Sequence, residues 1–207
     1  MRNVKEFGLE KEGIKIFDIY YKSKGWNIKR ITGLENRKRD VELRKDIGNK
    51  RQEIWIEEKT DNAYSNEYIK YAPIELIQDA GGATFSRGNF FTTGADYMIV
   101  QYLKGHTFYK MYVIEMRKLR QKFNGICCHR KSKYKFAYVK KGYGLTLLQL
   151  IEWDCLIKLN IAFDRTEAIR KILKTSGEDY ITGDIKKKKK RIKKNINIIG
   201  DDYEEID

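Results

Sequence analysis

The chain has 207 residues, of which 41% are hydrophobic and 13% aromatic, so we expect a folded domain and exclude wholesale disorder. No uncharged apolar run approaches the ~20 residues that cross a bilayer, and the N-terminus lacks the apolar stretch of a signal peptide. We therefore expect a cytoplasmic, intracellular protein without membrane contact. The net charge of +14 favours a polyanionic partner, with nucleic acid preferred over an anionic membrane.

The first sixty residues predict one helix and then three strands. Residues 5–24 carry apolar side chains at helical spacing and end at Gly25, a residue typical of helix C-termini. Strands are predicted over 27–32, 40–44 and 52–60. Charged connections that contain Gly or Asn join them, as in consecutive hairpins.

The middle of the chain predicts a second helix and a strand pair. We expect helical structure over 66–80, ended by the double glycine at 81–82. Pro73 marks a start or a kink, and its position fits the first turn of a helix that covers Ile74 to Ala80. Residues 95–103 and 107–116 are expected to form the strand pair.

The last third contains a strand, an apolar segment, a helix and a tail. In chain order these are a strand over 133–141, a buried apolar segment over 144–161, a helix over 164–175 with Asp164 as its N-cap, and a flexible Lys-rich then acidic tail over 176–207. We therefore expect a single domain over 1–175, of the α/β or α+β type, with a mixed sheet at its centre.

Acids and a lysine gather at the end of the third predicted strand. Because side chains in a strand alternate, Glu57 and Lys59 share one side and Glu58 the other. If 40–44 is the antiparallel neighbour, Asp40 lies opposite that end. Carboxylate oxygens suit Mg²⁺, and a nearby ammonium can orient a water or stabilise developing negative charge. A solvated strand end is the alternative interpretation.

This pattern resembles the PD-(D/E)XK nuclease superfamily, the restriction-endonuclease-like fold. Its core is a helix, a three-strand meander, a second helix and a further strand. Asp40 matches the acid at the start of the second strand, and Glu57-Glu58-Lys59 matches the E-x-K element on the third. The stretch that follows, with Glu75 and the strand opening Ala95-Asp96-Tyr97, is similar to small phage-type members. No proline precedes Asp40, and the resemblance covers about residues 5–116.

The resemblance implies an α/β nuclease that hydrolyses phosphodiester bonds, with DNA favoured over RNA. It implies a Mg²⁺ ion, replaceable by Mn²⁺, that is bound by Asp40, Glu57 and the main-chain carbonyl of Glu58. Lys59 is then expected to orient or deprotonate the attacking water. Glu12 on the first helix is a further candidate ligand. The family also suggests a phage or mobile-element origin, and a homodimer where duplexes are cut. Glu42 could replace Asp40 because both share a face of their strand.

The second half of the domain, residues 117–175, is expected to hold the substrate. Residues 117–141 contain ten Lys/Arg and no acid, with aromatic residues interspersed. Cations there can contact phosphates and aromatics can stack on bases, although the aromatics could instead be core residues. The candidate nucleic-acid contacts are Arg117, Lys118, Arg120, Lys122, Arg130, Lys131, Lys133 and Lys135.

Two other functions compete with a nuclease. A basic α/β domain could bind nucleic acid without cutting it, and such a protein would bind DNA without cleavage both in Mg²⁺ and in EDTA. An interaction protein, such as a phage-encoded inhibitor, would show no nucleic-acid affinity even at low salt.

Overall fold

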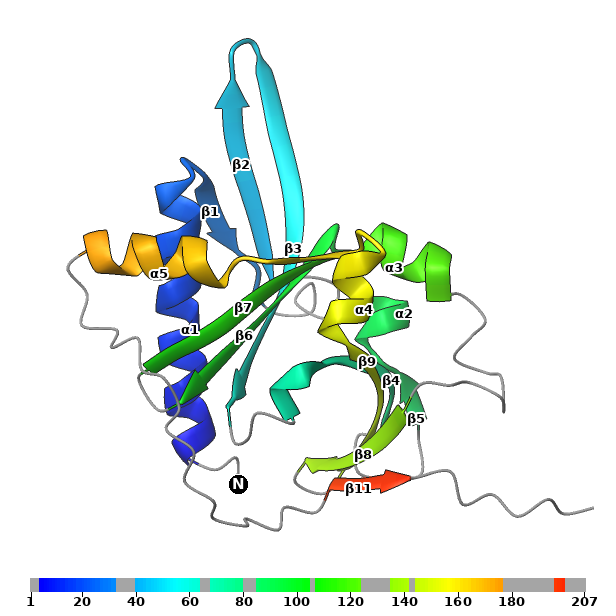
Figure 1. Cartoon of the computed structure of the whole chain (residues 1–207). Coiled ribbons are helices and arrows are strands. Elements are labelled where there is room, and N and C mark those ends of the chain that lie inside the picture. Colours follow the sequence, from blue (N-terminus) through cyan, green and yellow to red (C-terminus); the bar gives the residue numbers. More distant parts are fainter. Residues whose placement is uncertain are drawn as a thin grey trace, which may run out of the picture.

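The computed structural model describes residues 4–32, 40–63, 68–79, 85–104, 107–123, 135–141, 144–176 and 196–199. They form a mixed α/β fold with a mixed sheet flanked by helices, which confirms the predicted class (Figure 1). A second sheet lies beside the first, so the described chain contains two sheets rather than one.

The large sheet has six strands in the order β1-β2-β3-β6-β7-β10. The meander β1-β2-β3 is antiparallel, β3 and β6 are parallel, and β6-β7-β10 are again antiparallel. The predicted meander and the predicted strand pair are therefore confirmed. The strand bounds are β1 Asn27–Arg30, β2 Val41–Ile47, β3 Lys50–Asn62, β6 Tyr97–Lys104, β7 Thr107–Glu115 and β10 Ala162–Asp164.

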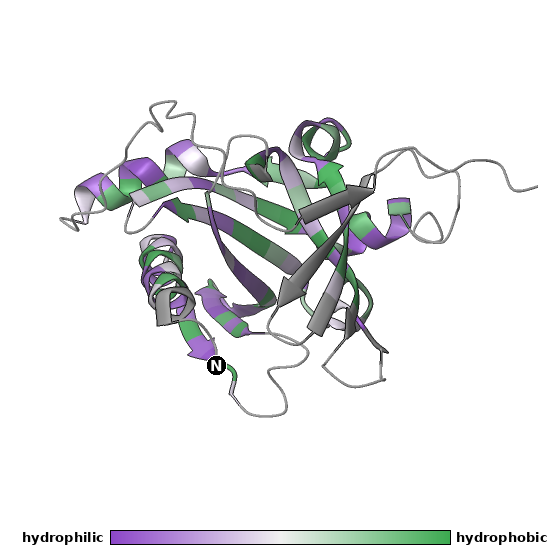
Figure 2. Ribbon diagram, turned by 90° about the horizontal axis from the view of Figure 1, so that it is seen from below, coloured by the Kyte–Doolittle hydropathy of each residue, from purple (hydrophilic) through white to green (hydrophobic). Residues whose placement is uncertain are grey.

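Two helices cover one face of the large sheet. Helix α1, Val4–Ser23, presents Phe17 and Tyr21 to Ile56 and Ile99 of the central strands, and all four side chains are buried. Helix α5, Thr166–Thr175, packs into the same cluster. Figure 2 shows green, hydrophobic stretches along the central strands and mixed colours along the helices, as amphipathic packing requires. No helix in the described part of the chain is long and apolar enough to span a membrane.

The predicted helix bounds are close to those observed. α1 and α5 confirm the predictions over 5–24 and 164–175. Arg165, rather than Asp164, occupies the N-cap position of α5. Asp164 nevertheless helps the helix begin, since its Oδ1 accepts a hydrogen bond from the N–H of Thr166 at 2.8 Å.

Gly13 lies where α1 approaches the sheet most closely. A Cβ at this position would overlap the Thr60 hydroxyl and lie 2.6 Å from Gln101 Nε2. These two side chains hydrogen bond to each other at 2.9 Å, so neither can move away without losing a partner. Close approach of helix and sheet therefore requires glycine here.

We expect Gly13→Ala to destabilise the protein by at least about 1 kcal/mol, because the overlap outweighs the helix-propensity gain of alanine. Gly8→Ala in the same helix is the matched control, since a Cβ there meets nothing within 4 Å. It should be neutral or stabilise by up to about 1 kcal/mol. Urea unfolding of both variants gives the comparison, and equal stability of the two would contradict the packing argument.

The second sheet has five strands in the order β11-β8-β9-β4-β5. It contacts the other face of the large sheet, where Ile74 and Ile151 share a buried cluster with Met98 and Val100. Three short helices complete this core: α2 Asn89–Thr92, α3 Met116–Phe123 and α4 Trp153–Lys158. The strand bounds are β4 Tyr71–Asp79, β5 Phe85–Arg87, β8 Lys135–Lys141, β9 Gly144–Glu152 and β11 Ile196–Ile199.

The helix predicted over 66–80 is wrong. Residues Tyr68–Lys70 form one 3-10 turn, and the chain then continues as β4. Ala72, Ile74 and Leu76 alternate into the core, but the intervening Pro73 and Glu75 are buried as well. The strand therefore lacks the polar alternation that identifies a half-buried strand. Pro73 is tolerated because β5 pairs only with the end of β4, which leaves its beginning at the sheet edge.

The other late elements fall close to their predicted places. The strand predicted over 133–141 is β8, and the apolar segment 144–161 divides into β9 and α4. Within the predicted tail, Ile196–Ile199 pairs antiparallel with β8, and the rest of the tail beyond residue 176 lies outside the described residues.

Candidate active site

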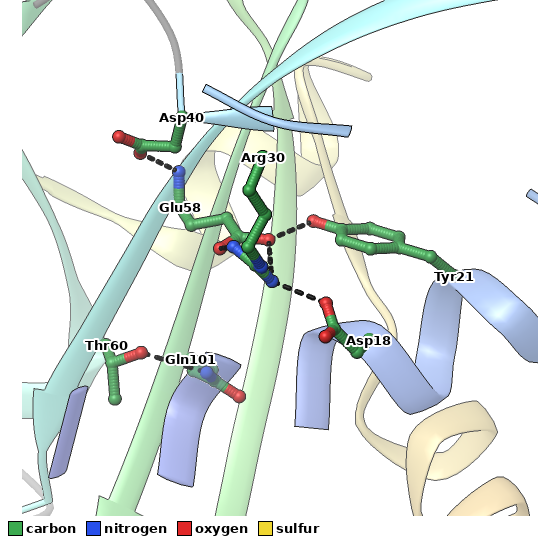
Figure 3. Close-up of polar contacts among 7 residues, drawn as sticks. All are labelled: Asp18, Tyr21, Arg30, Asp40, Glu58, Thr60 and Gln101. Carbon is green, nitrogen blue, oxygen red and sulfur yellow. Dashed lines mark hydrogen bonds and ion pairs between the residues drawn. The ribbon is translucent and has the colours of Figure 1, made fainter. Parts of the chain in front are cut away.

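Asp40 directly precedes β2 and is bound to the middle of β3. Its N–H donates to the carbonyl of Ile56 at 3.0 Å, and its Oδ2 accepts a hydrogen bond from the N–H of Glu58 at 2.7 Å (Figure 3). The register pairs Val41 with Ile56, so Asp40 lies across from Glu57. The second Asp40 oxygen points away from the Glu58 bond.

The side chains of Glu57-Glu58-Lys59 leave β3 on two sides. Glu58 projects toward α1, where its carboxylate meets Tyr21. Lys59 and Glu57 project to the other side, toward the second sheet and the α2–β6 connection. Alternation along a strand thus places Glu57 and Lys59 together and Glu58 apart.

Lys59 forms an ion pair with Glu75 of the second sheet. The Lys59 Nζ lies 2.6 Å from Glu75 Oε1, and the Glu75 side chain is only 5% exposed. A charged pair this deeply buried joins the two sheets and fixes the lysine head group. Sequence reasoning placed Glu75 on a helix and missed this contact. The sequence feature that points to Glu75 is its position as a single acid inside the apolar run Tyr71–Ile77.

Glu57 is held by the connection between α2 and β6. Thr93 donates its hydroxyl to Glu57 Oε2 at 3.2 Å, and the same hydroxyl accepts a hydrogen bond from the N–H of Ala95. Arg120 fixes this connection by donating to the carbonyls of Phe90, at 3.0 Å, and Thr93, at 2.6 Å. Arg120, predicted as a nucleic-acid contact, thus supports the loop behind Glu57.

A polar network anchors Glu58 on the α1 side of β3 (Figure 3). Tyr21 donates its hydroxyl to Glu58 Oε1 at 2.9 Å, and Arg30 Nη1 lies 2.8 Å from Oε2. The Arg30 Nη2 also reaches Asp18 Oδ1 at 2.5 Å. Burial raises the pKa of the Glu58 carboxyl, although Arg30 and Tyr21 pull it down. The side chain of Glu58 therefore has a structural role, and its main chain is what lies beside Asp40.

We expect Arg30→Leu to cost about 3 kcal/mol, because it leaves the Glu58 carboxylate buried without its cation. Arg51→Leu is the control, since its pair with Asp46 spans 3.5 Å and both side chains are about two-thirds exposed. That change should cost under about 0.5 kcal/mol. Urea unfolding at pH 7 measures both. Equal losses for the two arginines would show that the Glu58 network adds nothing.

Burial changes the acidity of Asp40. It raises the pKa of the carboxyl to about 6, against the hydrogen bond from the N–H of Glu58, which lowers it. The nearby Glu58 carboxylate raises the pKa further, while Lys59 and Arg30 lower it. Asp40 is thus a desolvated carboxylate within electrostatic reach of Lys59, in surroundings where an added cation would be favourable.

The three groups predicted to bind magnesium are of the chemical type that this ion prefers. Asp40 and Glu57 supply carboxylates and Glu58 a main-chain carbonyl, all hard oxygen donors. No three His, Cys, Asp or Glu side chains among the described residues lie close enough to hold one ion. Two carboxylates and a carbonyl nevertheless suffice for Mg²⁺, which keeps several waters and takes substrate oxygens as its remaining ligands.

The two other candidate ligands are engaged elsewhere. Glu12 forms an ion pair with Lys15 at 3.2 Å on α1, and it belongs to no group of three potential metal ligands among the described residues. Glu42 is buried and pairs with Arg44 and with Lys29. Neither glutamate therefore joins Asp40 in the described structure.

The remaining predicted nucleic-acid contacts lie mostly on or after α3. Arg117 is 76% exposed, and Lys118 pairs with Glu115 at 2.7 Å. Lys122 is exposed and Lys135 begins β8. Arg130, Lys131 and Lys133 lie outside the described residues. The cations of α3 that point to solvent are thus Arg117 and Lys122.

Comparisons of the chain with protein-family models, with curated proteins and with solved structures found no match.

Proposed function

We propose that this protein is a metal-dependent nuclease that hydrolyses phosphodiester bonds, with DNA as its substrate and a restriction-endonuclease-like core. The observation that carries the proposal is the hydrogen bond from the N–H of Glu58 to Asp40. This bond joins Asp40, the acid at the start of the second strand, to Glu58, the central residue of the E-x-K element on the third strand. The order of α1, the meander β1-β2-β3 and the parallel strand β6 supports the same core. Among the described residues between β3 and β6, the place of the family's second helix is taken by β4, β5 and the four-residue helix α2.

In this proposal, Asp40, Glu57 and the carbonyl of Glu58 would hold Mg²⁺, and Mn²⁺ could replace it. A metal held there would supply Lewis-acid chemistry for the scissile phosphate and for the activation of water. Lys59 orients the attacking water and offsets charge that develops on the phosphate. Glu75 is a positioning residue, because it holds the Lys59 ammonium at 2.6 Å. Thr93 is also a positioning residue, because its hydroxyl donates a hydrogen bond to the Glu57 carboxylate.

The test is incubation of the protein with supercoiled, linear and single-stranded DNA, in Mg²⁺ and in EDTA. We expect Mg²⁺-dependent cleavage and none in EDTA. Binding without cleavage under every condition would overturn the proposal.

A nucleic-acid-binding protein without catalysis is the second candidate. The observation that favours it is the short ion pair of Lys59 with Glu75, because a lysine held by a buried carboxylate is constrained as a catalytic group. This candidate predicts DNA binding in both Mg²⁺ and EDTA, with no product in either.

A further inference from the structure

The β2–β3 hairpin extends beyond the large sheet as a ribbon (Figure 1). Strand β1 pairs with β2 only up to Arg44, and β3 pairs with β6 only from Ile56 onward. Asp96 marks the end of that second pairing, where its N–H donates to the carbonyl of Trp55 and its Oδ2 accepts the N–H of Trp55, both at 2.8 Å. Within the described chain, residues 45–52 therefore pair only with each other, and we call them the free ribbon.

Solvent surrounds the end of the free ribbon. Every residue from 46 to 53 is exposed, and Ile47 beside the turn is 56% exposed. Gly48 has φ of 59°, so the turn needs glycine and the ribbon has a defined end. A two-stranded ribbon with no buried face is marginal by itself, and an exposed isoleucine at its tip adds nothing to its stability. These features are typical of an element that is buried by a partner.

The free ribbon carries more cations than acids. It contains one acid, Asp46, and three cations, which are Lys45, Lys50 and Arg51. Arg51 lies 3.5 Å from Asp46 with both side chains about two-thirds exposed, so that pair is weak and can open toward another anion.

We infer that the free ribbon enters a groove of duplex DNA and makes the protein prefer duplex over single-stranded substrate. The inference rests on the proposed function. A two-stranded ribbon fits the major groove, which is about 12 Å wide. Lys50 and Arg51 then face the flanking phosphates, and the aliphatic tip at Ile47 contacts base edges.

The ribbon sets a distance along the duplex. Ile47 lies seven positions after Asp40, and a strand rises about 3.3 Å per residue, so the tip lies up to about 23 Å from the candidate metal site. At about 3.4 Å per base pair this corresponds to six or seven pairs. The groove contact is therefore separate from the bond that is cut.

The test compares two double charge reversals in EDTA, where no cutting is expected. Lys50→Glu/Arg51→Glu changes the ribbon, and Lys171→Glu/Lys174→Glu changes two exposed lysines of α5 by the same net charge. Affinity is measured by fluorescence anisotropy for a 30-base-pair duplex and for one of its strands. We expect the duplex affinity of the ribbon variant to fall at least about 10-fold, and the slope of its log affinity against log salt concentration to decrease by about 2. The duplex affinity of the α5 variant should fall less than about 3-fold. The two variants should bind the single strand with equal affinity.

Equal loss of duplex affinity in both variants would overturn the inference, as would equal loss of duplex and single-strand affinity in the ribbon variant. Cleavage in Mg²⁺ is assayed in parallel. If the ribbon variant selectively loses duplex affinity but the wild type never cleaves DNA, only the nuclease proposal is overturned. If the wild type cleaves DNA but the ribbon variant keeps its duplex affinity, only this inference is overturned.

Discussion

Lys59→Met is expected to reduce the rate of DNA cleavage about 10²–10³-fold while DNA affinity stays within about threefold of the wild type. The reason is that the lysine acts on the attacking water and on the charge that develops in the transition state. Methionine keeps the length and apolar stem of the side chain and removes only the ammonium. Single-turnover cleavage and anisotropy in EDTA measure the two quantities separately.

The same variant leaves Glu75 buried without its cation, so it also loses stability, by about 3 kcal/mol. The control is Lys59→Met/Glu75→Gln, in which no uncompensated charge remains. This double variant should regain much of the stability but none of the activity. Wild-type cleavage by either variant, or parallel loss of binding and cutting, would contradict the role given to Lys59.

Asp40→Asn is expected to lower cleavage at least about 10³-fold and at the same time to stabilise the protein at neutral pH. The activity falls because asparagine lacks the charge that holds the metal. Stability rises because burial has lifted the pKa of the Asp40 carboxyl from its usual 3.8 to about 6, which makes ionisation unfavourable in the folded state. Asparagine still offers an oxygen to the N–H of Glu58.

The sign of the pH dependence follows from this raised pKa. Below about pH 4 the carboxyl is protonated in both the folded and the unfolded chain, and the stability that the neutral Asp40 side chain contributes is fully present. As the pH rises through 6 the folded protein must ionise a desolvated group, and that stability is lost. The variant should therefore exceed the wild type by about 2 kcal/mol at pH 7.5 and by much less at pH 4.5. Urea unfolding at both values checks this, and a less stable variant at pH 7.5 would show that the charge is favourable.

Local patterns of the sequence were sufficient to predict the part of the fold that carries the candidate site. The apolar spacing on α1 and the alternation along β3 both determine which side chains face the core, and the structure follows them. The same alternation separates Glu57 and Lys59 from Glu58, as expected. These features depend on neighbours close in the chain.

Long-range contacts could not be predicted in this way. The strand β4 is buried on both sides, so its period of two is hidden and the sequence predicts a helix in its place. That prediction hides the partner of Lys59, because Glu75 reaches the lysine only from a second sheet. The basic neighbours of Arg120 predict a contact with substrate, whereas its guanidinium donates to two backbone carbonyls. In each case the tertiary partner, not the local pattern, determines the role.

An anomalous difference map from crystals soaked in Mn²⁺ would locate the metal directly. We expect one strong peak at coordinating distance from the carboxylates of Asp40 and Glu57, and no such peak in crystals of Asp40→Asn. Manganese bound elsewhere in crystals of an active protein, or no peak beside these two carboxylates, would show that Asp40 and Glu57 do not form the metal site.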